Sequence, residues 1–91
     1  MNPKLEKTLV VKNKLGLHAR AAAQLVKTLN SFRCEVQLEA NGQKVNAKSI
    51  MGVLMLAASK GTSVKAFFEG EDAKEALEAL VYLFENKFGE E

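Results

Sequence analysis

The sequence predicts a single open-faced, two-layer α+β domain, in which helices cover one face of a mostly antiparallel sheet. Ninety-one residues provide for one hydrophobic core, so we expect one domain over residues 1–91. Some segments alternate apolar and polar residues, as strands with one buried face do, and others carry apolar residues at helical spacing. The segments follow in the order β-α-β-β-α-β-α. Strands with a single apolar face are typical of an antiparallel sheet that is open to water on its other side.

The first strand and the first helix are separated by a loop that contains the only histidine. The segment "TLVVKN" (8–13) is rich in β-branched residues and has Leu9 and Val11 on one face. The next helix carries apolar residues at helical spacing, namely Ala22, Leu25, Val26, Leu29 and Phe32. His18 therefore lies at the junction between a strand and the start of a helix.

A hairpin is predicted after this helix. The segment "CEVQLEA" (34–40) alternates, with its apolar side made of Cys34, Val36, Leu38 and Ala40. Asn41 and Gly42 supply the two positive-φ residues of a tight hairpin turn. A shorter partner strand then contains Val45 and Ala47.

A second helix and a fourth strand follow the hairpin. Ser49 is the expected N-cap of the helix "SIMGVLMLAA" (49–58), and Gly61 is expected to close it. The segment "TSVKAFFE" (62–69) alternates as a strand does, and it places Phe67 on the outward face without an evident reason.

The last helix has the clearest pattern. Asp72 and Glu75 form a start that is similar to a capping box. One apolar stripe follows, made of Ala73, Ala76, Leu77, Leu80, Val81 and Phe84.

The charge distribution is asymmetric although the net charge is only +2. Residues 1–68 carry eleven Lys and Arg against three Asp and Glu, whereas residues 69–91 carry two against eight. A basic surface favours acidic partners or anionic ligands, but the same charges also serve solubility alone. Because few aromatic residues accompany the basic ones, we do not expect nucleic-acid binding.

The sequence carries no signal for a membrane or for secretion. Its longest apolar run, "VLMLAA" (53–58), is far shorter than the ~20 residues that a membrane span needs, and no signal-peptide pattern is evident. Cys34 is the only cysteine, so an internal disulfide is excluded, which is compatible with a reducing compartment. We expect a cytoplasmic protein.

The stretch "GLHARAAAQ" (16–24) has the features of an anion site. A helix N-terminus exposes unpaired N–H groups and carries about half a unit of positive charge, so Arg20 in the first turn is unfavourable without an anion nearby. No acidic residue occurs from His18 to Arg33, and Gly16 allows a sharp turn. Histidine ionises near about pH 6.5, so a neutral, nucleophilic imidazole is available. A phosphoryl group on His18 would meet these N–H groups and the guanidinium of Arg20.

Other interpretations of this histidine stay open on the residues alone. A lone histidine is most often a surface or capping residue. One His and one Cys make a transition-metal site only with added carboxylates. Acid–base catalysis would need an orienting carboxylate, and the nearest acids in the sequence, Glu6 and Glu35, share no motif with His18. A Walker-type loop and a GxGxxG motif are both absent.

Two motifs, "GLHARAAAQLVK" and "NGQKVNAKSIMGVLMLAASKG", precede an acidic C-terminal helix. Together they resemble the HPr family, the histidine-containing phosphocarriers of the bacterial sugar phosphotransferase system, over nearly the whole chain and in the same order. The resemblance implies a four-stranded antiparallel sheet with three helices on one face. It also implies a carrier without enzymatic activity of its own and without a cofactor or a metal. The nitrogen-related branch of the family is compatible with the sequence.

The resemblance also implies a route for the phosphoryl group and two site residues. The group would come from phosphoenolpyruvate through enzyme I and pass to sugar-specific A components. His18 matches the acceptor, phosphorylated on Nδ1, and Arg20 matches the arginine that stabilises the phosphoryl group. The family commonly has proline after this arginine, where this chain has Ala21. Alanine should preserve the helix, while transfer rates or partner choice should change.

The resemblance also implies a docking surface for these partners on the segment "SIMGVLMLAA" (49–58). It contains too many apolar residues for one buried stripe, so Val53 and Leu56 should enter the core. The docking residues that match the family, with the lysines that would flank them, are Ile50, Met51, Leu54, Lys27 and Lys48.

Ser49 matches the serine that HPr kinase/phosphorylase modifies in many members. A phosphate there would add about two negative charges beside the docking residues and oppose an acidic partner. An alternative function is therefore a protein-binding regulatory module, independent of phosphorylation or regulated through Ser49. The intact pair of His18 and Arg20 favours the carrier. We expect a monomer.

Overall fold

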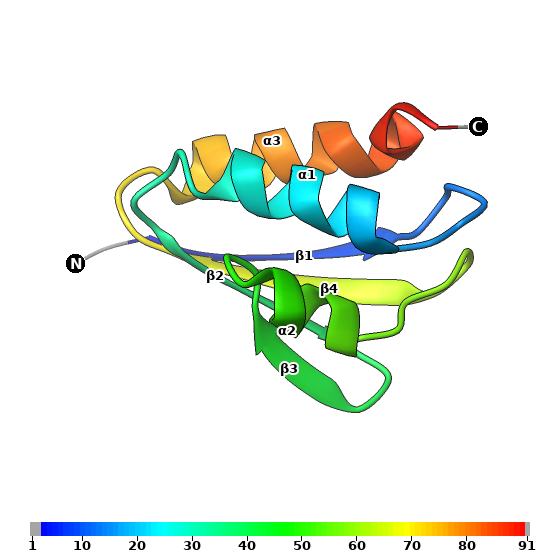
Figure 1. The fold of residues 1–91 in the computed structure, drawn as a ribbon. Helices are drawn as coiled ribbons and strands as arrows, with labels where there is room; N and C mark the ends of the chain where they lie inside the picture. Colours follow the sequence, from blue (N-terminus) through cyan, green and yellow to red (C-terminus); the bar gives the residue numbers. More distant parts are fainter. Residues whose placement is uncertain (1–2, 91) are drawn as a thin grey trace.

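The computed structural model describes residues 3–90 and has the predicted order of elements (Figure 1). The sheet has the strand order β1-β4-β2-β3, and every neighbouring pair is antiparallel. Its strands are β1 (Lys4–Val10), β2 (Glu35–Ala40), β3 (Gln43–Asn46) and β4 (Ser63–Glu69). The helices are α1 (Ala19–Leu29), α2 (Ile50–Met55) and α3 (Ala73–Glu85), and a short 3-10 turn, η1 (Lys87–Gly89), follows α3. The predicted α+β architecture is confirmed.

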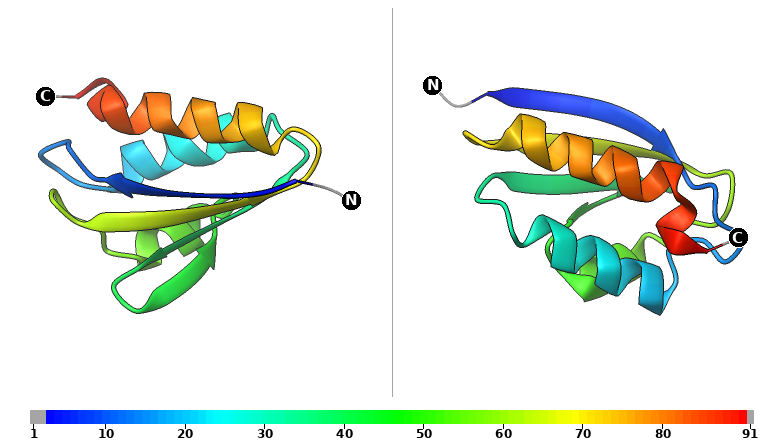
Figure 2. Two further views of the ribbon diagram at one scale, coloured as in Figure 1. Left: turned by 180° about the vertical axis from the view of Figure 1, so that it is seen from behind. Right: turned by 90° about the horizontal axis from the view of Figure 1, so that it is seen from above.

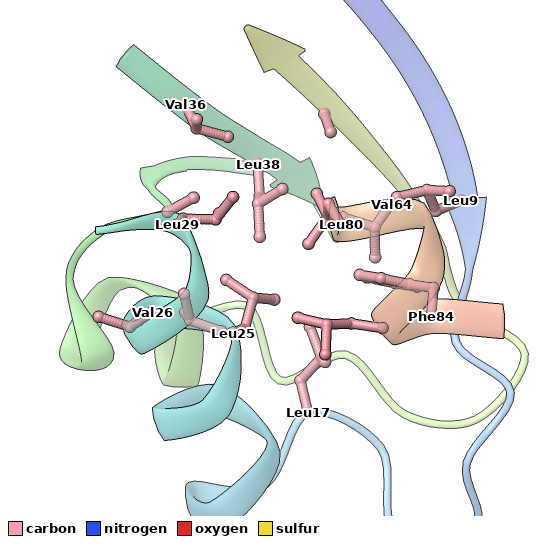
Figure 3. Close-up of a cluster of buried hydrophobic side chains, with 14 of the residues drawn as sticks. Leu9, Leu17, Leu25, Val26, Leu29, Val36, Leu38, Val64, Leu80 and Phe84 are labelled. Carbon is pink, nitrogen blue, oxygen red and sulfur yellow. The ribbon is translucent and has the colours of Figure 1, made fainter. Parts of the chain in front are cut away.

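A single apolar layer joins the helices to the sheet. Helices α1 and α3 lie side by side across one face, and α2 packs against α1 and β3 (Figures 1 and 2). Figure 3 shows the centre of this layer, with buried side chains that include Leu9, Leu25, Leu29, Val36, Leu38, Val64, Leu80 and Phe84. Burying one such side chain contributes roughly 1.5–3 kcal/mol, so this layer fixes how α1 and α3 lie on the sheet.

Local sequence patterns predicted the two central strands correctly. The apolar positions of β2 and β4 are buried and their polar positions are exposed, as strict alternation requires. Asn41 and Gly42 form the predicted turn between β2 and β3, with φ values of 51° and 78°.

The first strand differs from its prediction, which covered residues 8–13. It runs over Lys4–Val10, because these residues pair with β4 along their whole length, from Glu69 to Ser63. Lys7 masks the pattern, because this exposed charged residue lies on the same face of the strand as Leu5 and Leu9. Val11 is buried as expected but lies just beyond the strand, where its N–H donates to Thr62 (3.0 Å).

The prediction that Gly61 closes the second helix is wrong. Helix α2 ends at Met55, and Ala57 then takes a left-handed conformation with φ of 50°. The side-chain amides of Asn41 and Gln43 donate to carbonyl groups at the end of this helix, at 2.8 and 3.1 Å. The β2–β3 hairpin therefore supplies the cap, which spacing within the helix could not reveal.

The predicted capping box at Asp72 is also wrong. Asp72 is the N-cap of α3 by position, but its side chain makes no capping hydrogen bond. Its carboxylate accepts instead from the N–H groups of Arg33 and Cys34, both at 2.8 Å, and ties the start of β2 to α3. The hydrogen bond from Arg33 is the main cause that lowers the pKa of Asp72. Burial is the main cause that raises the pKa of the Cys34 thiol, to about 11.

The depressed pKa of Asp72 predicts a loss of stability in acid. The ionised carboxylate stabilises the folded state, so its contribution is complete above the ordinary pKa of 3.8 and is lost as the pH falls through the folded value. Urea unfolding between about pH 5 and about pH 2 should show a steeper decline of the free energy of unfolding in the wild type than in Asp72→Asn. The exposed Glu75→Gln should keep the wild-type slope. Equal slopes for wild type and Asp72→Asn would contradict this role.

Candidate functional site

His18 is the N-cap of α1, at the junction that the sequence predicts. Its backbone is extended (φ −74°, ψ −179°), and its carbonyl accepts from the N–H of Ala22 at 2.8 Å. The imidazole does not cap the helix, and 28% of the side chain is exposed. The N–H groups of Ala19, Arg20 and Ala21 have no acceptor within the helix and carry the positive end of its dipole. The helix survives with Ala21, as expected.

Glu90 completes the site, and the sequence analysis missed it. Its Oε2 atom lies 2.5 Å from Nε2 of His18 and 3.8 Å from Nε of Arg20. Its Oε1 atom accepts from Nδ2 of the buried Asn13 at 3.0 Å. The orienting carboxylate that seemed to be lacking is therefore present, 72 residues along the chain from the histidine. The only sequence signal is the acidic C-terminal segment of a chain whose histidine has no acid near it.

A left-handed turn brings Glu90 to the histidine. Lys87, Phe88 and Gly89 have φ values of 55°, 54° and 75°. Such a conformation costs about 1–2 kcal/mol for each residue other than glycine. Burial of Phe88 offsets this cost, since its ring packs on that of Phe84 with centroids 5.2 Å apart. The C-terminal segment accordingly lies beside the loop that follows β1 in both views of Figure 2.

The electrostatics favour an ionised Glu90. The hydrogen bond from Asn13 is the largest influence that lowers the pKa of Glu90, and His18 and Arg20 act in the same direction while burial opposes them. A carboxylate only accepts hydrogen bonds, so the proton of the neutral His18 imidazole resides on Nε2. The lone pair is then on Nδ1.

The loop ahead of His18 is held against the segment that follows α2. The N–H of Leu17 donates to the carbonyl of Ala58 at 2.9 Å, and Nδ2 of Asn13 donates to the carbonyl of Gly16 at 2.7 Å. Gly16 has φ of 70°, and a Cβ atom there would lie 2.5 Å from the carbonyl oxygen of Ala58. Glycine is therefore required both by the turn and by the close approach.

A hollow of about 450 Å³ opens at this place. Its lining residues are Lys14, Leu15, His18, Arg20, Gly89 and Glu90. Arg20 is 76% exposed and only loosely paired with Glu90, so its guanidinium is free to turn toward an anion in the hollow. The arrangement suits a small anion bound at the helix N-terminus.

The expected docking residues lie on and around α2. Ile50 and Met51 are exposed and Leu54 is half-buried, while Val53 and Leu56 are fully buried, as expected. Met55 is also exposed and was missed.

The polar residues predicted beside this surface differ in their freedom. Ser49 caps α2, since its Oγ accepts from the N–H of Gly52 at 3.1 Å. Lys27 is exposed in the last turn of α1. Lys48 is not equally free, because its ammonium donates to the carbonyl of Phe32 at 2.6 Å.

Comparison with known proteins identifies the family. The family model described as "PTS HPr component phosphorylation site" matches residues 5–86. The chain belongs to the HPr family. The phosphocarrier protein HPr of Xylella fastidiosa (strain 9a5c) is 54% identical over 87 residues, which are 96% of this chain and 98% of that protein.

Solved structures of HPr proteins have the same fold as this chain. HPr-C-His from Thermoanaerobacter tengcongensis superposes with a TM-score of 0.91 at 52% identity, covering 96% of this chain and 98% of the other. An HPr dimer from the same organism has a TM-score of 0.76 at 52% identity and covers 88% of this chain and 92% of the other.

Family membership confirms the general function. The chain is an HPr-type phosphocarrier of the phosphotransferase system and not a catalytic enzyme. Over residues 3–90, no three potential metal ligands come together, and no helix is long and apolar enough to cross a membrane.

The contact at Gly16 predicts a large effect of one added methyl group. Gly16→Ala should lower the free energy of unfolding by about 2–4 kcal/mol, because it combines a left-handed conformation with a backbone clash. Gly42→Ala is the matched control, since Gly42 has φ of 78° but no atom within 4 Å of the added Cβ. It should cost about 1 kcal/mol. Similar losses in both variants, measured by urea unfolding, would show that the Ala58 contact is unimportant.

Proposed function

We propose that His18 carries the phosphoryl group, which arrives from phosphoenolpyruvate through enzyme I and leaves for the A components of sugar permeases. The observation that supports this most is the 2.5 Å contact between Nε2 of His18 and Glu90. It leaves Nδ1 with a lone pair, next to a helix N-terminus that suits phosphoryl oxygens.

The transfer step follows from this arrangement. The lone pair of Nδ1 attacks phosphorus, a P–N bond forms, and the bond to the donor atom breaks with its electron pair returning to the donor. Because Nε2 keeps its proton, the phosphorylated ring of His18 is positively charged. The carboxylate of Glu90 stabilises that charge, while N–H groups of α1 and the guanidinium of Arg20 bind the phosphoryl oxygens. A cationic ring is a good leaving group, so onward transfer is easy.

Partner docking is assigned to the surface made of Ile50, Met51, Leu54 and the newly found Met55, with Lys27 beside it. These side chains adapt to several partners because methionine is flexible and apolar. Ser49 is proposed as the residue that HPr kinase/phosphorylase phosphorylates. The hydrogen bond from the N–H of Gly52 to its Oγ must break before that oxygen reacts. A cytoplasmic location, a monomeric state and the effect of Ala21 on transfer rates stay predictions.

The carrier role is tested by the intact mass after incubation with phosphoenolpyruvate and enzyme I. The wild type should gain one acid-labile phosphoryl group and His18→Ala should gain none. Lys74→Ala, a change at an exposed residue at the start of α3 and far from Glu90 along the helix, should behave as the wild type. No transfer to folded wild type from several enzyme I paralogues would instead favour the regulatory binding module.

The role of Glu90 is tested by Glu90→Gln, which keeps the shape of the side chain and removes its charge. We expect the rate of phosphorylation by enzyme I to fall about tenfold, the effect of losing roughly 1.4 kcal/mol of charge-assisted hydrogen bonding. The ¹⁵N chemical shifts of the neutral imidazole should show a smaller share of the Nε2–H tautomer. Glu78→Gln is the matched control, because Glu78 is exposed on α3 and forms no salt bridge among residues 3–90. An unchanged tautomer ratio in Glu90→Gln would refute this role.

A further inference from the structure

The open face of the sheet carries a second hollow, of about 370 Å³. Its lining includes the aromatic ring of Phe67, the carboxylates of Glu6, Glu35 and Glu69, and the lysines Lys4 and Lys44. It lies at the end of the sheet where Lys4 opposes Glu69, whereas His18 follows the other end of β1. Because the two hollows share no lining residue, a ligand in this one would leave the proposed phosphoryl site free.

Phe67 forms the floor of this hollow. Strand registers place it between Glu6 on β1 and Gln37 on β2, on the face opposite to the helices. It is the one aromatic side chain that the four described strands present to this face. Its ring already binds a cation, since Nζ of Lys44 lies 4.1 Å from the ring centroid. The outward aromatic residue that the sequence left unexplained is thus a platform for a positive charge.

The carboxylates around Phe67 form no salt bridge among residues 3–90, although Lys4 lies opposite Glu69 and Lys44 also lines the hollow. Glu35 and Glu69 oppose each other directly in the β2–β4 register, an arrangement of like charges that destabilises a sheet. The salt bridges of residues 3–90 involve Glu85 and Glu90 only, so Glu6, Glu35 and Glu69 have no cation within 4.0 Å among these residues. We expect the repulsion between Glu35 and Glu69 to destabilise the sheet, and a bound cation would relieve it.

We propose that this face docks a basic segment of a partner protein, with an arginine stacked on Phe67 in place of Lys44 and paired with Glu35 and Glu69. A guanidinium fits better than a metal ion, because it is planar, stacks on aromatic rings and forks to carboxylates. In agreement, no group of three potential ligands for a metal ion forms within residues 3–90. Such a partner could bind while the phosphoryl group is carried on the far end of the molecule.

The test is an NMR titration of the ¹⁵N-labelled protein with acetyl-Gly-Arg-Gly-Arg-Gly-amide. The same peptide with citrulline in place of arginine is the control for shape without charge. We expect saturable shifts at the amides of Glu35, Gln37, Phe67 and Glu69 with the arginine peptide only. Phe67→Leu should weaken binding about two- to fivefold, the size of an exposed cation–π contact. Lys44→Met should strengthen it about twofold or more by removing the internal competitor.

Further variants separate a specific pocket from general charge attraction. The double variant Glu35→Gln/Glu69→Gln should weaken binding at least about threefold, whereas Glu75→Gln/Glu78→Gln on α3 removes the same charge and should have no effect. Thermal unfolding verifies that each variant is folded. Equal shifts with the citrulline peptide, or equal weakening by both double variants, would overturn the proposal. Shifts of these amides on dilution without peptide would overturn it too, because a second copy of the chain would then be the occupant.

Discussion

The packing of α1 and α3 on one face of the sheet brings together His18 and Glu90, the central pair of the proposed phosphoryl site. Leu25 and Leu29 hold α1 in the apolar layer, and Leu80 and Phe84 hold α3 beside it. One helix presents its first turn and the other its last turn at the same end of the sheet. His18 precedes α1 and Glu90 follows α3. The two residues meet, although they are far apart in the chain, because one core holds the start of α1 beside the end of α3.

Strained backbone is concentrated around that end of the molecule. Ala57, Lys87 and Phe88 are left-handed without being glycine, and each lies in a segment that contacts the site or its supporting loop. These conformations persist because tertiary contacts over-determine them, with Phe88 buried and Ala57 held next to the Asn41 hydrogen bonds. The remaining left-handed residue that is not glycine, Asn41, belongs to an ordinary hairpin turn. The burial of Phe88 offsets part of the free-energy cost of this strained backbone.

The sequence predicted what depends on neighbours in the chain and missed what depends on distant contacts. Alternation in residues 34–40 and the turn at Asn41 and Gly42 were sufficient because strand faces and hairpin turns follow local rules. Gly61 misled because the cap of α2 comes from the hairpin, and Asp72 misled because its carboxylate serves another element. His18 was found from a helix start, whereas Glu90 needed the tertiary fold.

The backbone hydrogen bond from Leu17 to Ala58 joins the loop before His18 to the segment that follows α2, the helix with the proposed docking residues. Gly16 also packs so closely on the carbonyl of Ala58 that no Cβ atom would fit between them. For a protein bound to α2, the imidazole of His18 therefore lies at a defined distance from the bound side chains. If the proposed docking holds, different partners need to match only that distance between the surface that contacts α2 and the group that reacts with His18.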